Sequence, residues 1–158
     1  EIVGNLVDRS RIRSDEIDDF LYMVVDQVMN YYLVSLSPGH KIVSKYSGRI
    51  SGERIAKQAK IQGLKNALDY LTDLFLYLKA GIINWEEGSD RIVIKMQESV
   101  YASGVKNINM ELCIFLAGIM EGILNVSTGE KWDVNERKCI ATGFPECEFH
   151  AKTLRQRV

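Results

Sequence analysis

The stretch from Glu136 to Phe149 reads ERKCIATGFPECEF and holds two of the three cysteines of the chain. Gly143 and Pro145 mark a turn in the middle of this stretch. Cys139 and Cys147 stand four residues on either side of that glycine, so they would face each other in a symmetric hairpin. Their β-carbons would then lie roughly 5 Å apart. Two thiols at that separation are close enough to bind one metal ion.

The third cysteine and one acidic side chain complete this candidate site. Cys113 falls on a predicted helix, and Glu136 precedes Cys139 by three residues. With Cys147 they form a set of three thiols and one carboxylate, which suits tetrahedral zinc. Four protein ligands leave no open position, and this pattern is typical of a structural zinc site rather than a catalytic one.

Two other interpretations of the cysteines remain open at this point. Free cysteine is among the most buried residue types, so the three thiols could simply fill the core. Cys139 and Cys147 could also form a disulfide across the hairpin. Spacing raises an objection to the metal site as well, because Glu136 and Cys139 are an odd number of residues apart and would point to opposite faces of a regular strand. A turn or bulge is therefore expected near Asn135 and Glu136.

The charge of such a site has to be balanced. Three thiolates and one carboxylate around Zn²⁺ leave a net charge of about −2, so the site needs backbone N–H donors or a nearby cation. The basic candidates are Arg137, Lys138 and Lys131.

Helical periodicity dominates the first half of the chain. Apolar residues at three- and four-residue steps predict helices over 14–36 and 64–80, with a last helix beginning at Asn107 or Asn109 and extending to about residue 124. Ser37 and Pro38 predict a further helix, which we expect to be interrupted near Ser47 and Gly48. Gly48 and Gly52 are interpreted as small residues that permit close helix packing. Cys113 lies in the first turns of the last helix, where the helix dipole is expected to lower the pKa of its thiol.

Alternating apolar residues predict two hairpins. Residues 82–85 should pair with 91–97, and residues 131–142 should pair with 146–154. Together with the helices this predicts an α+β fold, in which N-terminal helices pack on one face of a four-stranded antiparallel sheet and zinc joins the C-terminal helix to the last hairpin. We expect residues 1–158 to form a single domain, with 1–13 as a lead-in arm.

Composition narrows the range of partners. Twenty basic and twenty-one acidic residues give a formal net charge of −1, so no overall field recruits nucleic acid. No apolar run reaches the ~20 residues that span a bilayer, and we expect no membrane insertion and a cytoplasmic location. The chain begins at Glu1 without a methionine, so the natural protein is expected to start further upstream.

Four short motifs in the second half of the chain resemble the signature of the 4-vinyl reductase domain family. They are Gly118-Ile-Met-Glu-Gly122, Glu136-x-x-Cys139, Ala141-Thr-Gly143 and Cys147-Glu-Phe149. The family is similar in fold to subunits of the TRAPP vesicle-tethering complex. The resemblance implies an α+β domain that dimerises and a pocket for a small hydrophobic molecule. In phenol-sensing members, zinc is held by one cysteine, one glutamate and two further cysteines at a spacing similar to that found here.

The resemblance is incomplete around the ligand. Phenol sensors hold the hydroxyl group of phenol with a histidine and a tryptophan ahead of the first metal cysteine, and neither occurs at the corresponding spacing in this chain. Phenol is therefore not carried over. Tyr101, Phe115 and Trp132 lie near the metal-binding elements and are candidates to line a pocket, although aromatic residues at such spacing are also typical of a core.

Three functions are weighed on this basis. The first is a non-catalytic, sensor-type domain that binds a small hydrophobic ligand and carries a structural zinc site. The second is a reductase, or an accessory subunit, acting on a vinyl group of a tetrapyrrole; it would need a borrowed hydride donor, because no Gly-x-Gly-x-x-Gly motif follows a strand. The third is an assembly or scaffold subunit.

Overall fold

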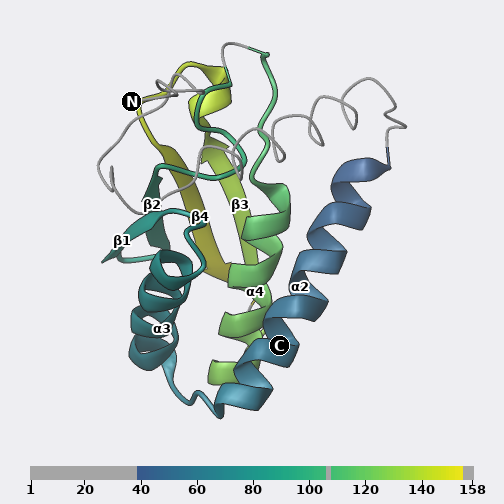
Figure 1. The fold of residues 1–158 in the computed structure, drawn as a ribbon. Helices are drawn as coiled ribbons and strands as arrows, with labels where there is room; N and C mark the ends of the chain where they lie inside the picture. Colours follow the sequence, from purple (N-terminus) through teal and green to yellow (C-terminus); the bar gives the residue numbers. More distant parts are fainter. Residues whose placement is uncertain (1–38, 106–107, 155–158) are drawn as a thin grey trace, which may run out of the picture.

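A four-stranded antiparallel sheet forms one layer of the structure (Figure 1). The structure is a computed structural model that describes residues 39–105 and 108–154. The strands are β1 (Ile82–Glu87), β2 (Ile92–Gln97), β3 (Trp132–Lys138) and β4 (Cys147–Thr153), in the order β1-β2-β4-β3. Both predicted hairpins are present, and the pairing of β2 with β4 joins them into one sheet. The predicted helix over 14–36 and the arm over 1–13 lie outside the described residues.

One face of the sheet forms the floor of the core. Ile92, Ile94 and Met96 alternate with half-buried residues along β2, as the period-two pattern predicted. Cys147 and Phe149 share the same buried face on β4. The terminal strand therefore directs its cysteine inward, toward the helices.

Three helices accompany the sheet in the described part of the chain: α2 (His40–Ala59), α3 (Leu64–Tyr77) and α4 (Ile114–Thr128). The α+β class is confirmed. α3 packs on β1 and α4 packs on β3, whereas α2 packs mainly on α4 (Figure 1). The expectation that the helices share one face of the sheet is thus refined, because α4 lies between α2 and the strands. This position explains why α4 is apolar around most of its circumference.

The predicted interruption of α2 near Ser47 and Gly48 is wrong. The helix is continuous, and Gly48 and Gly52 are buried inside it against α4. A Cβ atom on Gly48 would lie 2.1 Å from the carbonyl oxygen of Phe115, and one on Gly118 would lie 2.2 Å from that of Lys45. The glycines of the two helices therefore let their backbones touch, which is the close-packing interpretation of the sequence. Glycine in a helix is a weak breaker when its missing side chain makes room for a neighbour.

The start of α4 also differs from the prediction. Asn109 has a positive φ of 54° and precedes an irregular segment, and the helix begins at Ile114 with Cys113 as its N-cap. Asn107 lies outside the described residues. The helix ends at Thr128 because Gly129 adopts the left-handed conformation, with φ of 72°. In the part of the chain that the structure describes, no helix combines the length and the apolar character that a bilayer span requires.

Candidate metal centre

The four predicted ligands meet at one end of the sheet. Cys113 is the N-cap of α4, Glu136 lies near the end of β3, Cys139 follows β3, and Cys147 begins β4. One ligand atom from each of these residues lies within 4.8 Å of the others. The structure thus brings together all four residues of the cluster that the sequence analysis singled out.

A β-bulge resolves the objection about odd spacing. Glu136 pairs with Phe149, but Lys138 pairs with Glu148, so the register shifts by one residue between them. The extra residue turns Cys139 toward the side on which Glu136 already lies. The strand was predicted to run to residue 142, but it ends at Lys138 and a short 3₁₀ turn over Ile140–Thr142 follows. The bulge was expected before the strand proper and is found inside it.

The geometry of the cluster fits a tetrahedral metal ion. The sulfur atoms of Cys113 and Cys147 are 3.6 Å apart, and those of Cys147 and Cys139 are 3.9 Å apart. Zinc–sulfur bonds of about 2.3 Å in a tetrahedron separate two sulfurs by about 3.8 Å. Glu136 adds a buried carboxylate oxygen, Oε1, that has no hydrogen-bond partner among the described residues. An unpaired buried oxygen beside three thiols is costly without a cation.

These contacts bear on the two alternatives. All three cysteines are free thiols, so the cross-hairpin disulfide does not form between the described Cys139 and Cys147. Thiols that merely filled the core would be surrounded by apolar groups, yet here they surround a carboxylate. The donor set is the one that a thiophilic divalent cation prefers.

Backbone groups and a serine surround the cluster. The N–H of Cys113 donates to Oε2 of Glu136 at 2.9 Å, and the N–H of Ile140 donates to the sulfur of Cys147 at 3.4 Å. The hydroxyl of Ser99 lies 3.1 Å from the sulfur of Cys113 and accepts a hydrogen bond from the N–H of Tyr101. That hydroxyl can therefore donate its proton to a thiolate. These neutral donors can spread the negative charge of a bound metal complex.

The predicted cations serve elsewhere. Lys138 forms an ion pair with Glu148 at 2.8 Å, Lys131 lines a pocket between α2 and α4, and Arg137 is exposed. Charge compensation of the cluster thus comes from N–H and O–H dipoles rather than from these three side chains.

Burial dominates the acid–base properties of the cluster in the absence of metal. It raises the pKa of the Cys113 thiol well above its usual value, so the predicted lowering by the helix N-terminus is wrong for the metal-free protein. Burial likewise raises the pKa of Glu136 to about 9. Hydrogen bonds from Cys113 and Cys147 lower the pKa of Cys139. The metal-free cluster therefore concentrates its negative charge on Cys139.

These shifts predict opposite pH dependences for the two forms of the protein. Metal-free folded protein keeps the proton on Glu136 up to about pH 9, whereas the unfolded chain loses it near 4.5. The unfolded state binds fewer protons in that window, so the chelator-treated protein should lose stability as the pH rises from about 5 to about 8. Metal-loaded protein should gain stability over the same range, because protons compete with the metal for thiolate and carboxylate ligands. Melting curves at both pH values, with and without chelator, measure the two slopes, and parallel slopes would contradict the assignment.

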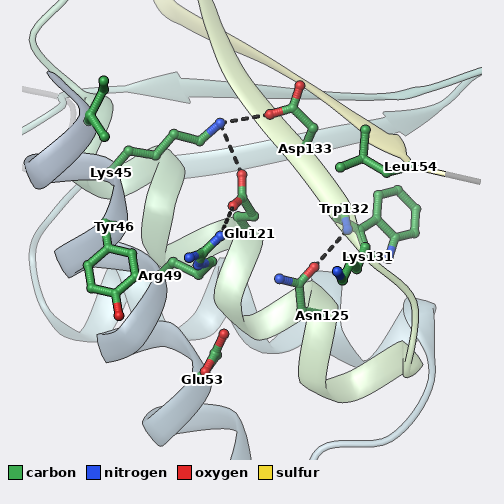
Figure 2. A pocket seen from close by; sticks show the side chains of 11 residues that line it. Lys45, Tyr46, Arg49, Glu53, Glu121, Asn125, Lys131, Trp132, Asp133 and Leu154 are labelled. Atoms are coloured by element: carbon green, nitrogen blue, oxygen red, sulfur yellow. Dashed lines mark hydrogen bonds and ion pairs between the residues drawn. The ribbon is translucent and has the colours of Figure 1, made fainter.

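The aromatic pocket candidates separate into two places. The rings of Tyr101 and Phe115 lie 6.2 Å apart, near the start of α4. Trp132 lies at the opposite end of that helix, where its indole N–H donates to Thr128. Fifteen helical residues separate the two places by about 20 Å. Trp132 lines an open pocket between α2, α4 and β3, and Tyr101 and Phe115 are not among the residues that line it (Figure 2).

Two buried polar residues were missed at the sequence level. Ser99 follows β2 and touches the cluster, but nothing in its local sequence separates it from other loop serines. Glu121 is buried on α4 and accepts a hydrogen bond from the N–H of Val134 at 3.1 Å. A single acid within the apolar run of residues 114–124 is the signal that could have revealed it.

Comparison with known families places the C-terminal part of the chain. Residues 92–153 match the family model of the vinyl 4-reductase domain. An uncharacterized protein of Methanocaldococcus jannaschii is 23% identical over 122 residues, which is 77% of this chain and 62% of that protein. The chain therefore spans less than two thirds of the length of this curated relative.

Solved structures show the same fold at low sequence identity. A vinyl-4-reductase family protein from M. jannaschii superposes with a TM-score of 0.61 at 19% identity, covering 90% of this chain and 85% of that one. Subunit 3 of the trafficking protein particle complex from Naegleria fowleri, covalently bound to palmitic acid, gives 0.63 at 13% identity, covering 87% and 95%. The phenol-responsive sensory domain of the transcription activator PoxR, with phenol, gives 0.64 at 15% identity, covering 86% and 75%. The resemblance to the 4-vinyl reductase domain family, and in fold to a TRAPP subunit, is thus confirmed, and residues 92–153 carry the family match.

Proposed function

We propose that this chain is a single, non-catalytic, sensor-type domain that binds a small hydrophobic ligand and is held together by a structural zinc ion. The ligands of the zinc are Cys113, Glu136, Cys139 and Cys147. The observation that carries the metal assignment is the convergence of these four donors within 4.8 Å at tetrahedral sulfur spacing.

The position of the cluster supports a structural role. Its donors come from the first residue before α4, from β3 and its turn, and from the start of β4. A bound ion would therefore fasten the buried helix to the final hairpin. All three cysteines are fully buried, and four protein ligands leave no position for a substrate.

Ligand binding is supported by the shared fold. One neighbour is a sensory domain solved with phenol, and another carries covalently bound palmitic acid. These ligands belong to those proteins, and at 13–15% identity the similarity concerns the fold alone. A small hydrophobic molecule is the class of ligand that we carry over as a proposal.

Metal analysis and native mass spectrometry of one purified sample test the proposal. We expect about one zinc per chain, a homodimer, and a small organic molecule released on denaturation. Protein that is purified in the presence of zinc but contains none would refute the metal centre. A recovered tetrapyrrole or hydride-carrying cofactor would favour the reductase alternative, and a stable assembly without any released molecule would favour the scaffold alternative.

A further inference from the structure

A second site lies at the far end of α4 from the cysteines. A pocket of about 650 Å³ opens between α2, the C-terminal half of α4 and the start of β3 (Figure 2). Asn125 in its wall lies twelve residues along the chain from Cys113, which corresponds to about 18 Å along a helix. The volume is in the range that accommodates a small molecule. The lining residues are Ile42, Lys45, Tyr46, Arg49, Glu53, Glu121, Asn125, Lys131, Trp132, Asp133 and Leu154.

The floor of this pocket is an ion-pair network that satisfies itself. The ammonium group of Lys45 lies 3.0 Å from Glu121, 2.8 Å from Asp133 and 3.2 Å from the side-chain oxygen of Asn135. These three acceptors match the three N–H bonds of a lysine. Both carboxylates of the floor are therefore already paired, and they do not call for a cationic ligand.

Hydrogen-bond donors remain in excess around the floor. Asn125 accepts the backbone N–H of Trp132 through Oδ1 at 2.7 Å, which fixes the amide so that its NH₂ group is the free end. Within the described ranges, that NH₂ group and the ammonium group of Lys131 have no hydrogen-bond or ion-pair partner. Arg49 makes one loose ion pair, 3.7 Å to Glu121, and 38% of its side chain is exposed. In Figure 2 the amide of Asn125 lies between the polar ends of Arg49 and Lys131.

The remaining acid does not cancel this excess. Glu53 lies on α2 with Arg49 and Lys57 four residues before and after it, so it has basic neighbours on its own helix. Lining side chains of apolar or aromatic character complete the pocket: Ile42, Tyr46 and Leu154 are exposed at its rim, and Trp132 is buried in its wall. The pocket thus offers donors for an anion beside apolar surface for an attached body.

We propose that this pocket binds a small amphipathic carboxylate. Arg49, Asn125 and Lys131 hold the carboxylate, and the apolar part of the ligand lies against Tyr46 and Trp132. Arginine, lysine and amide donors form charge-assisted hydrogen bonds with a carboxylate. This inference rests on the proposed ligand-binding function and narrows its ligand to an acid.

Three probes of similar size separate the contributions to binding. The metal-loaded full chain is titrated with benzoate, with benzyl alcohol as its neutral counterpart, and with acetate as the anion without an apolar body. Affinity is followed by calorimetry and by NMR shifts of the indole of Trp132. We expect benzoate to bind about tenfold more tightly than either of the others, because one charge-assisted hydrogen bond contributes about that much.

Two variants test the residues. Asn125→Asp keeps the oxygen that accepts the N–H of Trp132 but replaces the free NH₂ group with a negative charge, and Lys131→Gln removes one positive charge. Each should weaken benzoate binding about tenfold while leaving the melting temperature unchanged. Lys65→Gln, on an exposed lysine of α3, is the matched control and should bind like the unmodified protein.

Each contrary outcome overturns the inference. Benzyl alcohol binding as tightly as benzoate would remove the carboxylate and leave the proposed hydrophobic-ligand function standing. Acetate binding as tightly as benzoate would remove the apolar contact. Benzoate affinity that is unaffected by both variants, or absence of benzoate binding, would show that this pocket is not the site.

Discussion

Cys139→Ser and Cys147→Ser should each release the metal and destabilise the whole domain. A serine hydroxyl is a poor zinc ligand, and each variant leaves the buried Glu136 beside an incomplete donor set. Structural zinc sites contribute apparent binding free energies of about 10–16 kcal/mol in small zinc-binding domains, so a loss of about 5 kcal/mol in the free energy of unfolding is a conservative expectation here. Zinc content by mass spectrometry and unfolding by denaturant measure both effects.

Ser103→Ala provides the control for these substitutions. Its hydroxyl is buried and has no hydrogen-bond partner within residues 39–105 and 108–154, so its removal should leave zinc content unchanged and stability equal or slightly higher. A cysteine variant that retained one zinc per chain and the original melting temperature would show that the ligands were assigned wrongly.

Gly48→Ala should be the most disruptive small substitution in the helices. Its Cβ would lie 2.1 Å from the carbonyl oxygen of Phe115, and that oxygen belongs to the backbone of α4 and cannot rotate away. The two helices must move apart, at a cost of about 3 kcal/mol that exceeds the gain of about 1 kcal/mol from the better helix propensity of alanine. Gly118→Ala, on the facing helix, should behave in the same way, since its Cβ would lie 2.2 Å from the carbonyl oxygen of Lys45.

Gly39→Ala is the matched control. This glycine precedes the same helix with φ of −82°, and a Cβ there would meet no described atom within 4 Å. Its effect on the free energy of unfolding should stay within about 0.5 kcal/mol. Equal stability of the Gly48 and Gly39 variants would contradict the close contact between α2 and α4.

The metal cluster was predictable because its evidence is local. Cys139 and Cys147 are placed by one turn, and the period of β4 directs Cys147 inward. The bulge between Glu136 and Lys138 was also foreseeable, because the odd spacing of the ligands required some irregularity. Its position within the strand was not, because the register is set by pairing with β4 rather than by the residues of β3 alone.

Features that depend on contacts between distant segments escaped prediction. The continuity of α2 through Gly48 depends on α4 filling the space of the missing side chain. The start of α4 at Ile114 depends on Cys113, whose N–H is satisfied by Glu136 from another strand. Apolar periodicity in 108–113 could not show this, because buried irregular segments carry the same residue types as helices.

The pocket shows the same limit. Its donors come from α2, α4 and the start of β3, and in the sequence each of these residues looks like an ordinary exposed polar residue. Trp132 was singled out as a pocket residue, but its distance from Tyr101 and Phe115 follows from the direction of α4 and could not be read from spacing.

The strand order has a consequence for synthesis of the protein. β4 lies between β2 and β3, and both of its neighbours precede it in the chain. A nascent polypeptide that has emerged only as far as the turn after β3 holds one hairpin and one unpaired strand, with two thiols but not the third. The ribosome therefore delivers the strand that closes the sheet and the last sulfur donor, Cys147, in the same seven residues, Cys147–Thr153. Protection by chaperones would be needed up to that moment, since unpaired strand edges favour aggregation.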